Sequence, residues 1–311
     1  MIDGIKIEIN DQSQILKVLE KPILSFDQIN KEIKSSSILS NNKENKDVYD
    51  SNVETRIAKY KGLRFTLKIR ELDCEKKYKL FINGSLHKFY NEGFHNYNDF
   101  SYNNLLDTIA ILERTFDLQL DKCAVTNIEI GFNIIAPSNI NKIIDHIYLH
   151  NRKFPNLEIS TTMHLKRFAY YEYHIKLYNK TLQYKNSHKQ VPKNLLRFEI
   201  KYFKMRKSGL KHKLTLNDIK KFNLIETTNI VDKLVIEWNS LIFYDYTISG
   251  TNSKHITDLK NENFWKDCAK STKLKTNKTR LNKLIQNHSD KIQNKIQNLL
   301  ISKAQELGFY G

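Results

Sequence analysis

The chain has 311 residues, of which 51 are Lys or Arg and 34 are Asp or Glu, so its formal charge is +17 with histidine neutral. Hydrophobic residues make up 40% of the chain, which excludes wholesale disorder, and the length predicts roughly two domains, or one large domain with an appendage. The sequence has no apolar run of the roughly 20 residues that cross a bilayer, no secretory signal, and three cysteines too far apart for a zinc site or disulfide framework, so we expect a cytoplasmic protein that binds no membrane.

The first half of the chain predicts strands joined by tight turns. Glycine follows Lys61 in one turn and Asn83 in another, and such pairs favour the short turns of β-hairpins. A polar, low-complexity stretch over Ser35–Asn52 predicts a mobile loop or linker. In chain order we expect a strand over Gly4–Ile9, that loop, a hairpin of Arg56–Tyr60 with Leu63–Ile69, and a hairpin of Tyr78–Ile82 with Leu86–Tyr90.

The second half predicts helices that alternate with strands. Apolar residues recur at helical spacing after Ser101 and after Ser138, and a last apolar stripe before Gly308 predicts core packing or a dimer face. In chain order we expect a helix ending near Phe116, a strand over Val125–Ile135, a helix carrying Ile140–Ile147, strands over Arg167–Asn179 and Leu195–Phe203, mostly helix from Thr215, and a final helix over Asn277–Leu307 with its stripe from Leu281 to Leu300.

This order of elements predicts an α+β fold. We expect an antiparallel sheet with helices packed on one face, followed by a mostly helical C-terminal part. The chain is expected to divide into an N-terminal strand with a flexible polar segment (1–54), a central α+β domain (55–214) and a helical C-terminal region (215–311).

Basic residues are concentrated in the middle of the chain. Between Ser160 and Leu214 there are 14 Lys or Arg against two acids, a local excess of 14 − 2 = +12, among several tyrosines. Cations neutralise phosphates and aromatic rings stack on bases, so this stretch predicts a single-stranded nucleic-acid surface. A solvated basic face in a chain from an AT-rich genome remains the alternative. The residues expected to contact DNA are Arg167, Lys201, Lys204 and Arg206, with Lys273, Lys275, Lys278 and Arg280 from a second basic run.

Three of the predicted strands have one apolar and one polar face, because side chains alternate along a strand. If these strands are neighbours, one exposed face collects carboxylates, a histidine, a tyrosine and several cations. The polar sets are Asn127, Glu129, Gly131 and Asn133 in the first strand, Glu172, His174, Lys176, Tyr178 and Lys180 in the second, and Arg197, Glu199 and Lys201 in the third.

The acids on this face predict a metal site. Glu129 and Glu199, with His174 or Asn133, offer mostly oxygen ligands for a hard divalent cation, Mg²⁺ or Mn²⁺. Such an ion polarises a phosphodiester and neutralises developing charge. The alternative is an ordinary half-exposed sheet, in which the two glutamates pair with Arg197.

The tyrosine on this face predicts covalent catalysis. The Tyr178 hydroxyl is placed to attack phosphorus and form a phosphotyrosine link, while Lys176, Lys180 and Arg197 neutralise the phosphate. A second tyrosine can share this work, and the candidates are Tyr171, Tyr173 and Tyr184.

These segments also carry a family resemblance. "IKLYNKTLQY" (Ile175–Tyr184), followed by "LLRFEIKY" (Leu195–Tyr202), resembles the paired motifs of rolling-circle replication initiators. In the Rep-trans plasmid initiators and the filamentous-phage gene II proteins, a Tyr-Asn/Asp-Lys sequence precedes an Arg-x-Glu strand. "VTNIEIGFNI" (Val125–Ile134) is similar to the earlier strand of those families, usually Arg-x-Asp-x-x-x-Asp. Here Asn127, Glu129 and Asn133 stand in place of that Arg and the two Asp.

The resemblance implies a metal-dependent nickase that cuts one strand at a replication origin and stays joined to its 5′ phosphate. It implies Tyr178 as nucleophile, Lys180 as a phosphate contact, Glu199 and Glu129 as metal ligands, and Arg197 as orienting Glu199 or binding phosphate. It also implies a homodimer that binds double-stranded and single-stranded origin DNA and works with a host helicase. The central region would then be the nicking domain, and the C-terminal region would serve DNA recognition or dimerisation.

Three other functions remain open on the sequence. A DNA-binding replication regulator would bind without cutting, and Asn133 favours it. A metal-dependent nuclease using water would cut without becoming attached to DNA. A structural RNA-binding protein would show only salt-sensitive affinity.

Overall fold

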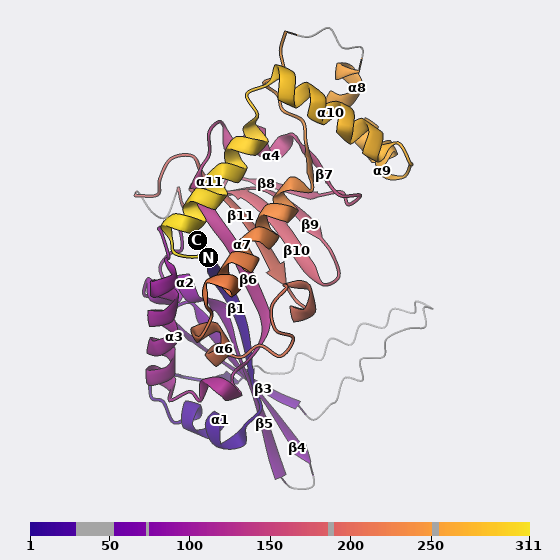
Figure 1. Cartoon of the computed structure of the whole chain (residues 1–311). Coiled ribbons are helices and arrows are strands. Elements are labelled where there is room, and N and C mark those ends of the chain that lie inside the picture. Colours follow the sequence, from indigo (N-terminus) through magenta and orange to yellow (C-terminus); the bar gives the residue numbers. More distant parts are fainter. Residues whose placement is uncertain (29–52, 73–74, 186–189, 251–254) are drawn as a thin grey trace, which may run out of the picture.

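The computed structural model describes residues 1–28, 53–72, 75–185, 190–250 and 255–311, so the loop predicted over Ser35–Asn52 lies outside the described residues. Within these ranges, ten strands form one antiparallel sheet in the order β2-β3-β4-β5-β1-β6-β11-β10-β9-β8 (Figure 1), and β7 pairs with β12 separately. The strands of the large sheet are β1 Ile2–Ile9, β2 Asp27–Gln28, β3 Val53–Tyr60, β4 Leu63–Leu72, β5 Glu75–Ser85, β6 Ala124–Ile135, β8 Asn156–Ser160, β9 Met163–Ala169, β10 Tyr173–Asn179 and β11 Leu195–Tyr202; the pair is β7 Ile147–His150 and β12 Leu241–Phe243.

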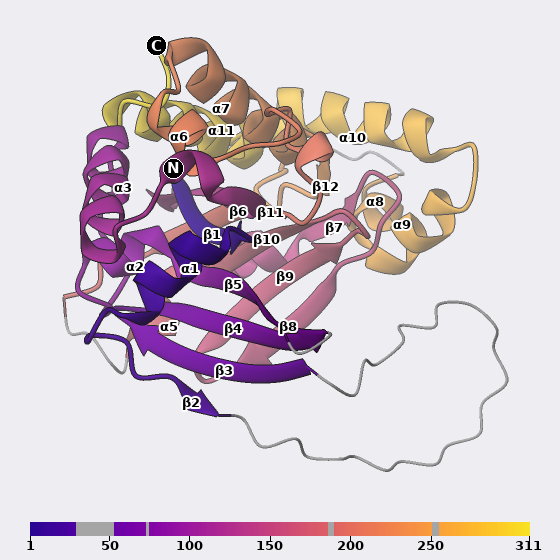
Figure 2. The ribbon, with the colours of Figure 1, turned by 90° about the horizontal axis from the view of Figure 1, so that it is seen from below.

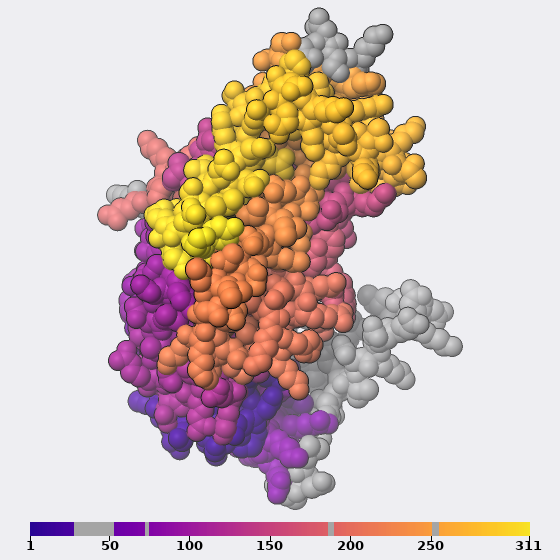
Figure 3. Space-filling model, in the orientation of Figure 1, coloured from indigo at the N-terminus to yellow at the C-terminus, as the bar shows by residue number. Residues whose placement is uncertain are grey.

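Helices cover one face of this sheet, as expected for the α+β fold. Figure 2 shows α3, α7 and α11 on the same side, and in Figure 3 the orange α7 and yellow α11 run across the molecule next to each other. The helices are α1 Gln12–Leu19, α2 Leu86–Tyr90, α3 Tyr102–Phe116, α4 Ile140–Asp145, α5 Lys180–Tyr184, α6 Leu216–Lys220, α7 Leu224–Asn239, α8 Ile256–Lys260, α9 Glu262–Ala269, α10 Leu274–His288 and α11 Ile292–Glu306.

The apolar faces of the central strands pack against these helices. Phe198 of β11 meets Trp238 of α7 edge-on, with 5.2 Å between ring centroids, and Phe132 of β6 meets Phe309 beyond α11 at 6.2 Å. Burying such rings removes a large apolar area from water, at about 25 cal/mol per Å². The alternation predicted for these strands is therefore confirmed, and the opposite face is left for polar side chains.

The two proposed domain boundaries do not fall at breaks in this core. Strand β1 lies in the middle of the sheet, between β5 and β6, although it belongs to the proposed region 1–54. Helices α7 and α11 share the main apolar core with the sheet, although they belong to region 215–311. A smaller cluster around Trp265, Leu281 and Ile285 packs α9 and α10 against the β7–β12 pair.

The second predicted hairpin is wrong. Strand β5 continues through Asn83 and Gly84, and the expected partner strand Leu86–Tyr90 is helix α2. Ser85 begins this helix, because its side chain accepts a hydrogen bond from the backbone N–H of Lys88. A Cβ on Gly84 would lie 2.6 Å from the carbonyl oxygen of Gly62, so glycine at this position allows the close approach of β4 rather than a turn.

Three further elements differ from their predicted lengths. The strand predicted over Arg167–Asn179 is two strands, β9 and β10, that pair as a hairpin around residues 170–172. Ile147 lies in β7 rather than in the preceding helix. The final helix is divided into α10 and α11, because Lys291 takes a left-handed conformation (φ 56°) that a helix cannot continue through.

The last apolar stripe is core in this fold. Ile296 and Leu300 of α11 are fully buried against the chain's own sheet, and Leu281 of α10 is buried in the smaller cluster. These side chains are occupied within one chain and do not form a free dimer face.

Candidate active site

The polar faces of three strands meet because β11 lies between β6 and β10. In the register of these strands, Arg197 stands between Tyr178 and Asn133, and the next polar position, Glu199, stands between Lys176 and Gly131. The adjacency on which the predicted polar face depended is therefore present. The side chains that form the cluster are those of Tyr178, Lys176, Arg197, Glu199, Glu129 and Asn133.

Glycines make room for the two glutamates. A Cβ on Gly131 would lie 2.5 Å from the Cβ of Glu199, and a Cβ on Gly4 of β1 would lie 2.9 Å from the Cβ of Glu129. If either glycine carried a side chain, a contact this short would force the backbone or the glutamate to move. Because both positions lack a side chain, both glutamates have room beside them, and their carboxyl groups meet at Lys176.

Arg197 is the centre of the cluster. Its guanidinium donates from Nη2 to Asp3 (2.7 Å), from Nη1 to the amide oxygen of Asn133 (3.1 Å) and from Nε to Glu199. The arginine is fully buried, so these hydrogen bonds to charged groups compensate for the loss of water around its charge. Its main role in this geometry is to orient Glu199. The salt bridge between Arg197 and Glu199, which the sequence analysis gave as the alternative to a metal site, is present.

Lys176 lies between the two glutamates. Its Nζ donates to Glu199 at 2.7 Å and to Glu129 at 3.3 Å. The side chains of Lys176 and Glu129 remain 21% and 15% exposed, whereas that of Glu199 is only 3% exposed. Lys176 is therefore the cation of the cluster that lies most open to solvent.

Tyr178 and Lys180 form the second half of the cluster. The Tyr178 hydroxyl donates to Glu199 at 3.3 Å, and Lys180 Nζ lies 3.4 Å from the Tyr178 oxygen. Lys180 follows the strand directly, as the first residue of α5, which Asn179 caps by accepting from the N–H of Leu182. Strand end and helix start thus fix the tyrosine and the lysine side by side.

Two members of the site were missed by the sequence analysis. Asp3 is buried and bonds Arg197, and Asn96 accepts from Lys180 Nζ (2.7 Å) and from the Tyr184 hydroxyl (2.8 Å) while donating to Asp3 (2.9 Å). The predicted strand began at Gly4, and alternation continued back from Ile5 would put Asp3 on the apolar side, but a bulge between Ile2 and Ile5 turns it to the polar face. Asn96 lies in the connection between α2 and α3, and nothing in its local sequence marked it.

The expectation of an exposed face is wrong at this cluster. Tyr178 is 7% exposed and Glu199, Lys180 and Arg197 are 2% or less exposed. The Asn96 segment and α5 close over this end of the sheet, because Asn96 bonds side chains from both β1 and α5. The site is a buried polar network that opens toward solvent at Lys176.

Burial and neighbouring charges shift the pKa values of Glu129 and Glu199 in opposite directions. Burial raises the pKa of Glu129 to about 7, and the nearby Glu199 contributes to this rise. Burial would also raise the pKa of Glu199, but Arg197 and Lys176 outweigh it, so its pKa is well below the ordinary value. Glu199 is therefore a permanent carboxylate at neutral pH, while Glu129 exchanges protons there.

The pKa shifts of Tyr178 and Lys180 both favour the uncharged form of the side chain. Burial, and then the charge of Glu199, raise the pKa of Tyr178 well above its usual value. Burial and the charge of Arg197 lower the pKa of Lys180 to about 7. A neutral amine on Lys180 is thus present at neutral pH, next to a hydroxyl that needs a base to lose its proton.

The side chains present do not fit the predicted Mg²⁺ or Mn²⁺ in this arrangement. Lys176 Nζ takes the place between Glu129 and Glu199, and the amide oxygen of Asn133 accepts from Arg197. Over the described ranges no three His, Cys, Asp or Glu side chains group around a possible ion. An ion at the carboxylates would have to displace the lysine, and metal binding stays a prediction.

His174 and two predicted DNA contacts lie farther along the same face. His174 is opposite Lys201, and its ring packs edge-on against Phe203 at 4.6 Å, away from the carboxylates. Arg167 is opposite Lys176 on β9 and pairs with Glu158 at 2.8 Å. Beyond the cluster, therefore, the open face continues as a row of basic and aromatic side chains.

The remaining predicted DNA contacts fall in two places. Lys204 and Arg206 are exposed just after β11, where Arg206 pairs with Glu172. The second basic run lies around α10, far along the chain from the cluster, with Lys273, Lys275 and Arg280 exposed and Lys278 half-buried.

The other half of the open face is also basic, which the sequence analysis did not identify. Lys6 of β1 is opposite Asn127, two residues before Glu129, so it shares the face of the cluster. The Nζ atoms of Lys6, Lys79 and Lys68 lie 4.7, 5.5 and 5.7 Å from the ring centroid of Phe81. These residues come from three separate segments, and only the pairing of β1, β4 and β5 brings them together.

Comparison with known proteins adds no assignment. Neither a protein-family model nor a curated protein sequence matches this chain. None of the helices in the described part of the chain is long and apolar enough to span a lipid bilayer.

Proposed function

We propose that this chain is a plasmid or phage replication initiator that nicks one DNA strand and transfers it through Tyr178. One observation carries the proposal: the Tyr178 hydroxyl lies 3.4 Å from Lys180 Nζ and 3.3 Å from Glu199, within a basic sheet face. The order of the Tyr-Asn-Lys and Arg-x-Glu segments supports it. Origin DNA, a second copy of the chain and a host helicase are the partners that this proposal implies.

The geometry supports a specific sequence of steps. The Tyr178 hydroxyl turns its one proton from Glu199 toward the neutral amine of Lys180, which takes it, and the phenolate oxygen attacks phosphorus. The bond from phosphorus to the 3′ oxygen breaks, the 3′ oxygen takes up a proton from solvent, and the 5′ phosphate stays on the tyrosine. Attack by a 3′ hydroxyl reverses these steps and transfers the strand.

The other cations stabilise charge in these steps. Lys176 contacts the phosphate from the exposed side of the cluster, and its link to Glu199 moves aside as the phosphate enters. Arg197 holds Glu199, which accepts from the Tyr178 hydroxyl and fixes its orientation. No step here depends on a bound ion.

The first prediction concerns the nucleophile. Supercoiled DNA of the replicon that encodes the protein is incubated with wild type, Tyr178→Phe and Tyr202→Phe. Tyr202 is a matched control, because it is a buried tyrosine on the apolar face of β11. We expect nicked DNA and a nucleotide-linked Tyr178 peptide, detected by denaturing gel and mass spectrometry, for wild type and control and neither for Tyr178→Phe.

Other results identify the competing functions. Nicking by Tyr178→Phe without an adduct would move the nucleophile to water, and an adduct elsewhere would move it to another tyrosine, which Tyr184→Phe tests. Loss of nicking in EDTA, restored by Mg²⁺ or Mn²⁺, would establish the predicted metal. Tighter binding to RNA than to DNA, with no cleavage of either, would identify an RNA-binding protein.

A specific observation favours a DNA-binding regulator as the second candidate. Tyr178 is buried, and Arg197 is saturated by Asp3, Asn133 and Glu199, as in an ion cluster that only stabilises a fold. Tight DNA binding with no nicking, under conditions in which a known initiator cuts its own origin, would select the regulator.

A further inference from the structure

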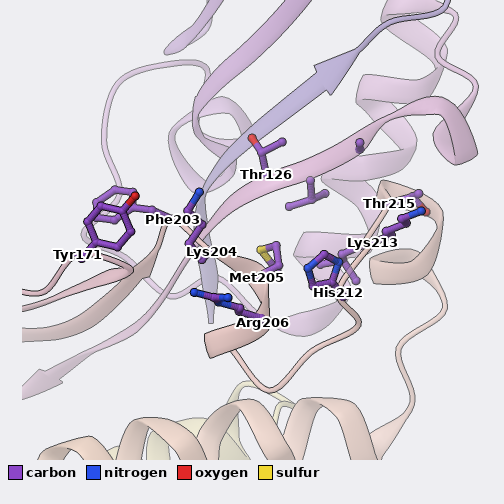
Figure 4. Close-up of a pocket in the computed structure, with 12 residues that line it drawn as sticks. Thr126, Tyr171, Phe203, Lys204, Met205, Arg206, His212, Lys213 and Thr215 are labelled. Carbon is purple, nitrogen blue, oxygen red and sulfur yellow. The ribbon is translucent and has the colours of Figure 1, made fainter. Parts of the chain in front are cut away.

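A second site lies at the far end of the strands that carry the cluster. A cavity of about 670 Å³ opens where β6 begins and β11 ends (Figure 4). This volume is within the roughly 300–1,000 Å³ of small-ligand pockets. Its lining residues come from β6, the β9–β10 turn and the segment after β11, and include Tyr171, Phe203, Lys204, Met205, Arg206 and His212.

The chemistry of this cavity suits a flat aromatic group attached to an anion. Its floor is apolar, because Val125, Met205 and Leu214 are buried. Tyr171, on the rim, is 87% exposed, so its ring face is open for stacking. Figure 4 shows Arg206 and His212 around the same opening.

The charge of the lining is entirely basic. Lys204, Arg206 and Lys213 line the cavity, and no acid is among the described residues that line it. Glu172 lies nearby, but Arg206 and Lys207 both pair with it. An anionic partner therefore matches the surface, and the apolar floor with an aromatic rim matches a base.

The cavity adjoins the open face of the sheet at Phe203, which lines it. Phe203 follows Lys201 by two residues, and the His174 ring contacts it. From Arg197 to Phe203 the strand advances six residues, about 20 Å at roughly 3.3 Å per residue. Lys201 lies between the two sites and can contact phosphates that cross this distance.

We infer that this cavity holds an unpaired base of single-stranded DNA, a few nucleotides from the phosphate that reaches Tyr178. The base stacks on Tyr171 and Phe203, and Lys204 and Arg206 contact the flanking phosphates. The inference rests on the proposed function for the position of the scissile phosphate. The cavity then selects which stretch of melted DNA is placed for cutting, by a contact remote from the reaction itself.

The first test measures affinity. Wild type, Tyr171→Ala and Phe94→Ala are titrated into a fluorescein-labelled thymidine oligonucleotide at one fixed salt concentration. Phe94 is the matched control, since it is an exposed aromatic residue in the turn after α2. Tyr171→Ala is expected to raise Kd about tenfold, the usual effect of losing one stacking partner, with the control within twofold of wild type.

The second test locates the bound strand. A thymidine oligonucleotide with 5-iodouracil at one position is crosslinked by light, and the attached peptides are sequenced. We expect crosslinks at Tyr171 or Phe203. Crosslinks confined to other segments, or equal affinities of Tyr171→Ala and Phe94→Ala, would overturn the inference, as would tighter binding of a uridine RNA oligonucleotide.

These tests fail separately from the proposed function. Crosslinks at Tyr171 without any adduct on Tyr178 would leave a single-stranded DNA site in a protein that does not nick. An adduct on Tyr178 with unchanged affinity of Tyr171→Ala would leave a nickase that places its strand by other contacts.

Discussion

At the scale of single residues, the site depends on how burial shifts two neighbouring groups. A free lysine keeps its charge far above neutral pH and cannot act as a base there. Burial beside Arg197 lowers the pKa of Lys180 to about 7, while burial keeps Tyr178 protonated by raising its pKa. The pair thus places a neutral amine beside a protonated hydroxyl at neutral pH, as the proposed proton transfer requires.

This pair predicts a pH dependence. The reactive form of Lys180 is the amine, so the rate of adduct formation should rise as pH increases through its pKa of about 7 and then level. In Lys180→Met we expect the rate to fall by at least about 100-fold and the rise to disappear. Single-turnover adduct formation, measured across this pH range by denaturing gel, gives both values.

Glu129 requires a control, because its pKa also lies at about 7. Glu129→Gln removes that titration and should keep the rise if Lys180 causes it. Loss of the rise in Glu129→Gln and its persistence in Lys180→Met would transfer the role to the glutamate.

At the scale of elements, the cluster depends on close approach between β6 and β11. Gly131 lies directly opposite Glu199, with no room for a side chain on that face. A methyl group there must push the glutamate or its strand outward. The absence of one carbon atom thus positions a carboxylate that contacts Lys176, Arg197 and Tyr178.

Gly131→Ala tests this close approach. We expect it to lower the free energy of unfolding by about 1–3 kcal/mol, as overpacking usually does, and to reduce nicking as Glu199 moves. Urea denaturation measures the first effect. Asn127→Ala, at a half-exposed polar position of the same strand, is the matched control. Equal unfolding midpoints for the two variants would contradict the steric account.

At the scale of the whole molecule, one face of the sheet is packed with helices and the other is basic. The basic face joins Lys6, Lys68 and Lys79 at one side to Lys201 and Arg167 at the other, with the cluster between them. Single-stranded DNA that lies across this face can place several of its phosphates against these cations at once. The basic residues around α10 form a separate surface.

The two surfaces predict different salt dependences. For single-stranded DNA each phosphate contact contributes about 0.7 to the slope of log K against log salt. The double variant Lys6→Glu with Lys68→Glu should therefore lower the magnitude of this slope by about 1.4. The variant Lys273→Glu with Lys275→Glu, at α10 in the region predicted to recognise origin DNA, should leave the slope for single-stranded DNA unchanged. A smaller slope for the α10 variant, with no change for the Lys6 and Lys68 variant, would place the DNA strand on α10.

The sequence by itself determined much of the site, because strand periodicity is local. Alternation in β6, β10 and β11 is enough to separate the apolar side chains from Glu129, Tyr178 and Arg197 within each strand. The hairpin at Lys61-Gly62 and the helix capped by Ser101 followed from short-range turn and capping signals and are confirmed. The α+β class followed from the order of these elements.

Tertiary structure alone decided what closes and charges the site. Asp3 reached Arg197 through a bulge, and Asn96 reached Lys180 through a connection distant in sequence. The position of Lys176 between two glutamates, and the pKa of Lys180, follow from burial and from charges on other strands. Burial and electrostatic effects add up over residues that are close in space. They cannot be predicted from the sequence until it is known which strands pair.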